Sequence, residues 1–166
     1  MTSQEILLAL RQRHAGRQWA FFPELRTGTG YDSYSRRDAE PHEQRIDAFV
    51  INCWPSKGNT AVAYEVKVSR GDFLRELASP EKRRFAEQVS SHCYFAVPFG
   101  TIKSAEIPDP WGCITVHDGV ARIIKQAVVR TLVPWPFWFI ASIARRIAKQ
   151  EESAEANHDR PLARRG

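Results

Sequence analysis

Residues 60–68 form an apolar segment that carries two opposite charges. Branched, aromatic and small apolar side chains fill most of it, which is typical of a buried strand. Glu65 and Lys67 interrupt this pattern. Side chains two apart in a strand share a face, so both charges point the same way and Val66 enters the opposite layer. Charges on a buried face cost free energy unless a partner or a function compensates them.

A second strand pattern, residues 46–52, lies just before this segment, and a turn at residues 55–59 joins the two. If the hairpin is centred on Ser56, residues whose numbers sum to 112 face each other, so Asp47 faces Glu65. Directly opposed residues on paired strands have β-carbons about 4.5–5.5 Å apart. The hairpin therefore predicts two neighbouring carboxylates.

Two carboxylates at that distance repel and need a cation. Mg²⁺ would serve, because it takes oxygen ligands and keeps several of its waters. The other interpretation is a structural ion pair between Lys67 and either Asp47 or Glu65 at the rim of the sheet. The spacing of the residues alone leaves both interpretations open, because a slip of one residue in register would separate the acids.

The remaining patterns predict a single α/β domain. They place helices at residues 2–14, 69–77, 79–90 and 136–150, and strands at 19–25, 46–52, 60–68, 94–97, 113–117 and 120–124. Helices and strands in this order predict a mixed central sheet flanked by helices, over residues 1–150. Residues 151–166 lack apolar periodicity, and we expect them to be a disordered polar tail.

Composition limits the compartment and the partners. The three cysteines, Cys53, Cys93 and Cys113, form no CxxC pair, which argues against a disulfide framework or a zinc site. We expect reduced thiols in a cytoplasmic protein.

The net charge of +5 permits a polyanionic partner without requiring one. The most apolar run, residues 132–143, is too short to span a bilayer, and we expect no membrane partner. The aromatic cluster between Trp135 and Ile140 offers a homodimer contact instead.

The two acids and the lysine are also part of a recognisable motif. Arg45-Ile46-Asp47 followed by Glu65-Val66-Lys67 resembles the D…(D/E)xK core of the PD-(D/E)xK nuclease superfamily. Within it, the chain resembles the bacterial MmcB-like DNA-repair proteins over about residues 19–125. The segments that carry this similarity are Phe22-Pro23-Glu24-Leu25, Glu65-Val66-Lys67-Val68-Ser69, Asp72-Phe73, Lys82-Arg83-Arg84-Phe85, Tyr94-Phe95-Ala96-Val97-Pro98 and Trp111-Gly112-Cys113-Ile114.

The chain departs from the family pattern at two places. Ile46 stands where the family has a proline, and the polar stretch 26–44 is longer than we expect. The first departure is common in the superfamily. The second predicts a different entrance to the site.

The resemblance implies a restriction-endonuclease-like fold, a catalytic role for Asp47, Glu65, Lys67 and Glu24, and a metal site. Asp47, Glu65 and the backbone carbonyl of Val66 would be ligands of Mg²⁺, for which Mn²⁺ would substitute. Lys67 would orient or help deprotonate the attacking water. Glu24 would complete the site directly or through water. Bound metal and a lysine together supply the nucleophile and the charge relief that phosphodiester hydrolysis needs.

Other residues are candidates for substrate contact or for support of the site. Basic side chains would hold the phosphate backbone; they are Lys82, Arg83, Arg84, Arg36 and Arg37. For the first three the alternative is a solvated helix face, and for the last two a disordered loop. Ser69, Asp72 and Gln88 would support the ligands from outside.

The expected activity is that of a Mg²⁺-dependent deoxyribonuclease in DNA repair or recombination, in an intracellular protein of bacterial or phage type. RNA is not excluded as a substrate. The alternative is a non-catalytic DNA-binding or scaffold protein that retains the fold. The intact set of Asp47, Glu65 and Lys67 favours the enzyme, because a retired site would have lost a member.

Overall fold

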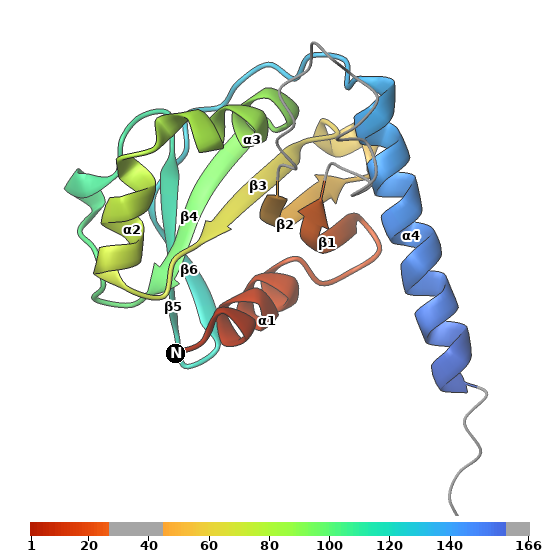
Figure 1. Ribbon diagram of the computed structural model, residues 1–166, viewed down its shortest axis with the longest axis horizontal. Helices are drawn as coiled ribbons and strands as arrows, with labels where there is room; N and C mark the ends of the chain where they lie inside the picture. The colour runs from red at the N-terminus through yellow and green to blue at the C-terminus, as the bar shows by residue number, and fades with distance from the viewer. Residues whose placement is uncertain (27–44, 159–166) are drawn as a thin grey trace, which may run out of the picture.

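A computed structural model describes residues 1–26 and 45–158 and, within the last helix, side chains as far as residue 153. In this part of the chain a six-stranded sheet runs in the order β1-β2-β3-β4-β5-β6 (Figure 1). The strands are β1 (Trp19–Arg26), β2 (Arg45–Asn52), β3 (Ala61–Val66), β4 (His92–Pro98), β5 (Gly112–His117) and β6 (Val120–Lys125). The pairs β3–β4 and β4–β5 are parallel and the other pairs antiparallel, which confirms the predicted mixed sheet.

Helices cover both faces of the sheet (Figure 1). They are α1 (Ser3–Arg13), α2 (Arg70–Leu77), α3 (Arg84–Val89) and α4 (Phe137–His158). One face packs against α1 through Ile6 and Leu10. The other face packs against Phe73 of α2, Phe85 of α3 and Phe139 of α4. Because side chains alternate along each strand, the sheet contributes apolar side chains to two separate layers, one on each face.

The β2–β3 hairpin has the register that the sequence predicts. Ala48 pairs with Tyr64, and Ile51 pairs with Ala61, so paired residue numbers sum to 112. A short 3-10 helix, η2 (Pro55–Lys57), makes the turn. Asp47 and Glu65 are the next positions in this register, at the open end of the hairpin.

The last helix is longer than expected. We predicted a helix ending at residue 150 and a disordered tail over 151–166, but α4 continues to His158. Residues 148–156 have strong helix formers such as Ala, Glu, Lys and Gln and no Gly or Pro, so the helix continues without an apolar stripe. The prediction for residues 159–166 lies outside the described residues.

The aromatic cluster at the start of α4 is divided between core and surface. Phe139 is fully buried, and the Trp135 indole N–H donates to the carbonyl of Val89 at 2.9 Å. Phe137 and Ile140 are exposed, Phe137 by 82%. The homodimer contact stays a prediction. In the described part of the chain, each helix is too short or too polar to cross a bilayer.

A buried histidine joins α1 to the sheet. His14 Nε2 lies 2.7 Å from the Tyr64 hydroxyl, and its ring meets Trp19 edge to face. Its Nδ1 is buried and has no hydrogen-bond partner among the described residues. Burial lowers the pKa of His14 from 6.5 to about 4, with a smaller contribution from the charge of Arg13.

We expect His14 to make the fold less stable in acid. The unfolded chain takes up a proton near pH 6.5 and the native state only near pH 4, so stability falls as pH drops through that range. Unfolding by urea between pH 4 and 8 should show that His14→Gln is less sensitive to acid than the wild type, by up to about 3 kcal/mol at pH 4. The exposed His117→Gln serves as control, and equal sensitivity in both variants would contradict this role for His14.

Candidate active site

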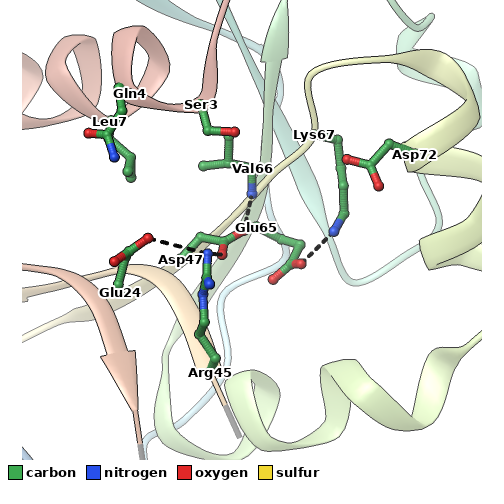
Figure 2. A pocket seen from close by; sticks show the side chains of 10 residues that line it. All are labelled: Ser3, Gln4, Leu7, Glu24, Arg45, Asp47, Glu65, Val66, Lys67 and Asp72. Atoms are coloured by element: carbon green, nitrogen blue, oxygen red, sulfur yellow. Dashed lines mark hydrogen bonds and ion pairs between the residues drawn. The ribbon is translucent and has the colours of Figure 1, made fainter.

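A pocket lies at the end of the sheet where β1 and β3 finish and β2 begins (Figure 2). The side chains that line it come from α1, the three strands, the segment between β3 and α2, and the start of α2; they are Ser3, Gln4, Leu7, Glu24, Arg45, Asp47, Glu65, Val66, Lys67 and Asp72. The expected convergence of Asp47, Glu65 and Lys67, with Glu24 beside them, is confirmed. Their catalytic roles stay predictions.

The strand geometry is irregular at Glu24 and Asp47, which lie between the paired residues Pro23–Ala48 and Leu25–Ile46 of β1 and β2. Glu24 has a φ of 50°, a left-handed conformation that is uncommon for residues other than glycine. In β2, Ile46 and Phe49 enter the same apolar layer although they are three residues apart. The regular alternation therefore breaks at this level, and both carboxylates lie on the pocket instead of in a core layer. Strained backbone of this kind is enriched at functional sites.

One carboxylate oxygen of Asp47 contacts the backbone, and the other contacts a half-exposed side chain. Its Oδ2 accepts a hydrogen bond from the backbone N–H of Val66 at 2.9 Å. Its Oδ1 lies 3.1 Å from the guanidinium of Arg45, which also lies 3.4 Å from Glu24. The Asp47 side chain is 17% exposed and that of Arg45 is 49% exposed. The contact of Asp47 with Val66 thus lies within the edge of the sheet, and its contact with Arg45 lies at the protein surface.

Lys67 lies between two carboxylates. Its Nζ is 2.6 Å from Glu65 and 3.0 Å from Glu76 of α2, and all three side chains are less than 20% exposed. Glu76 was not among the predicted site residues. It lies one helical turn after Asp72, but only the packing of α2 on the sheet reveals its contact with Lys67.

The acids of the pocket repel one another. Burial, and after it the nearby charge of Asp47, raises the pKa of Glu65 to about 7 against the opposing effect of Lys67. Burial alone would lower the pKa of Lys67, but its contacts with Glu65 and Glu76 outweigh burial and raise that pKa. Asp47 and Glu65 therefore form a repelling pair, for which Lys67 compensates in part.

The donor atoms suit a hydrated magnesium ion. The Val66 N–H points to Asp47, and the carbonyl of a strand residue points to the same side as its N–H, so the Val66 carbonyl faces the same strand edge. Mg²⁺ is commonly bound by one or two carboxylates and keeps several waters. The described residues include no cluster of three or more His, Cys, Asp or Glu that would hold a metal ion. An ion held by Asp47, Glu65 and the carbonyl would therefore have to keep most of its waters.

Arg83 is not where the sequence analysis expected it. It was assigned with Lys82 and Arg84 to an exposed phosphate-binding face, but it is only 8% exposed. Its guanidinium donates to the backbone carbonyl of Glu76 and lies 6.0 Å from the centre of the Phe95 ring. The Arg83 guanidinium thereby satisfies a backbone carbonyl at the end of α2 and is not available to bind a phosphate. Lys82 and Arg84 are exposed.

The three residues expected to support the metal ligands lie in different places. Asp72 lines the pocket, whereas the Ser69 hydroxyl caps α2 by accepting a hydrogen bond from the Asp72 N–H at 3.2 Å. Gln88 is exposed on α3 and is not part of the pocket lining. Arg36 and Arg37 lie outside the described residues.

Comparison with known proteins informs the fold alone. The sequence matches no family model, and no curated protein is significantly similar to it. A solved structure of a protein of unknown function from Silicibacter pomeroyi is similar to this chain, with a TM-score of 0.64 and 15% sequence identity. The similarity covers 98% of this chain and 97% of the other. The α/β architecture is thus shared along the whole chain.

Asp47→Asn should leave the fold as stable as the wild type or stabilise it. An asparagine oxygen can still accept the Val66 N–H, while the charge that raises the pKa of Glu65 is removed. In the wild type the native state keeps the Glu65 proton up to about pH 7 and the unfolded chain loses it near 4.5, so stability falls across this range. The gain from Asp47→Asn should therefore grow from pH 4.5 to pH 7.5, where it reaches about 1 kcal/mol.

Urea unfolding of both proteins across this range measures the effect. Asp47→Ala is the matched control, because it leaves the Val66 N–H without its acceptor and should cost about 1–3 kcal/mol. Equal destabilisation by Asn and Ala at every pH would show that the charge of Asp47 is itself stabilising, as in a structural ion pair.

Proposed function

We propose that this protein is a metal-dependent nuclease that hydrolyses phosphodiester bonds in DNA, in repair or recombination. The observation that carries the proposal is that Asp47 and Glu65, next to the last paired residues of β2 and β3, line one pocket with Lys67. The resemblance of these residues to the D…(D/E)xK core supports the same chemistry.

Each residue has a distinct task in the proposed reaction. Asp47, Glu65 and the Val66 carbonyl would hold Mg²⁺, which when bound supplies Lewis acidity and a more acidic water. Lys67, held by Glu65 and Glu76, would present an ammonium group to the phosphate. A fixed cation there stabilises the charge that develops on the phosphate oxygens in the transition state. This arrangement favours orientation and charge stabilisation by Lys67 over removal of a proton from water.

Substrate binding would involve surface cations beyond the pocket. Lys82, in the 3-10 helix η3 (Pro80–Arg83), and Arg84, at the start of α3, are exposed and follow α2 in the chain. Contacts of this kind position a nucleic acid without reading its sequence. They support DNA and RNA equally, so the preference for DNA rests on the family resemblance.

A second candidate function is non-catalytic DNA binding or a scaffold role. One observation favours it: the charged groups of the pocket already satisfy one another. Lys67 has two carboxylates, and both oxygens of Asp47 have donors. Such a network is also what a purely structural ion cluster needs.

Replacing Lys67 separates the two candidates. Lys67→Ala should reduce Mg²⁺-dependent DNA cleavage by at least about 10²-fold, because the interaction acts mainly in the transition state. DNA binding rests on many phosphate contacts and should change little, with a salt slope altered by about one unit. Glu65→Gln should behave in the same way. Cleavage and binding are measured on the same labelled single-stranded, nicked, flapped and branched DNAs and on single-stranded RNA, with Mg²⁺, Mn²⁺ or EDTA.

Lys57→Ala is the matched control, because Lys57 lies in the turn at the opposite end of the β2–β3 hairpin. It should cleave like the wild type. Cleavage that survives Lys67→Ala would place the chemistry elsewhere. Tight binding without cleavage of any substrate by the wild type would favour the scaffold role.

A further inference from the structure

Arg45 is a pocket residue to which the proposed function gives no role. It is the first residue of β2, and its guanidinium lies between two acids, 3.1 Å from Asp47 Oδ1 and 3.4 Å from Glu24 (Figure 2). Half of its side chain is exposed, so the guanidinium can turn into solvent without leaving a buried cavity. Its position relative to Asp47 therefore matters for any cation that enters the pocket.

The two carboxylate oxygens of Asp47 have different kinds of partner. Oδ2 is held by the Val66 N–H, a backbone donor within the sheet that side-chain motion cannot remove. Oδ1 is held by the half-exposed side chain of Arg45. A cation that binds Asp47 through Oδ1, the oxygen on the surface side, therefore meets the guanidinium of Arg45 there.

We propose that Arg45 is an internal counter-cation that competes with the metal for Asp47. This inference rests on the proposed function. In the metal-free protein the guanidinium neutralises part of the charge of Glu24 and Asp47. An ion that binds Oδ1 displaces the guanidinium from that oxygen. The arginine thereby lowers the metal affinity of the site, both by this contact and by its like charge.

The ion pair between Arg45 and Asp47 is weak enough for a metal ion to displace it, yet its removal should change the metal affinity measurably. Half-exposed ion pairs contribute little to stability, and a divalent ion interacts with a carboxylate more strongly than a single guanidinium charge does. Removal of Arg45 takes away both the competitor and a like charge near the ion. We expect Arg45→Ala to bind Mn²⁺ about three- to tenfold more tightly than the wild type.

The experiment measures Mn²⁺ binding by electron paramagnetic resonance, without nucleic acid and at fixed ionic strength. Arg45→Lys keeps the charge but loses the planar fork, so its affinity should lie between those of the wild type and Arg45→Ala. Arg122→Ala removes the same charge from an exposed position on β6 and should bind like the wild type. Asp47→Asn should lose the binding. Circular dichroism confirms that each variant is folded.

The outcomes distinguish this inference from the proposed function. If Asp47→Asn abolishes Mn²⁺ binding but Arg45→Ala binds no more tightly than Arg122→Ala, the competition is absent and the metal site stands. If the wild type binds no Mn²⁺, or Asp47→Asn binds it equally well, both the metal site and the role of Arg45 are wrong. Tighter binding by Arg45→Ala than by Arg122→Ala, lost again in the double variant with Asp47→Asn, supports the competition.

Discussion

The pairing of β2 with β3 brings Asp47 and Glu65 into one pocket, just beyond the last paired residues, and every other feature of the pocket depends on it. A slip of one residue would move the side chains of one strand to the other face. Packing on both faces prevents this slip, since Val50 lies beside Val62 in the layer under α1 and Phe49 lies beside Ala63 in the opposite layer. The apolar core thus holds two repelling carboxylates together.

The second constraint is the packing of α2, which supplies the acid that the lysine needs. Ser69 caps this helix, and fully buried Phe73 attaches it to the sheet against Phe95. One turn further, Glu76 reaches Lys67. The Lys67 ammonium is therefore held from the sheet and from a helix, so its position depends on tertiary packing as much as on its own strand.

Local patterns predicted most of the fold and part of the site. Alternation of apolar residues located the strands, and the turn at 55–59 set the β2–β3 register, because both signals lie within short stretches of chain. Glu76, the buried position of Arg83 and the role of Arg45 could not be predicted, because they depend on contacts between elements. The length of α4 follows from helix propensity, which a search for apolar periodicity overlooks.

The left-handed backbone at Glu24 restricts which amino acids this position tolerates. Glycine would relax the backbone but remove the carboxylate. Aspartate and asparagine adopt this conformation more readily than most side chains but are one methylene shorter than glutamate. A branched side chain would meet the steric penalty in full and contribute no charge. The position is thus a compromise between chain geometry and charge, and a protein that had abandoned the carboxylate would gain stability by drifting to glycine.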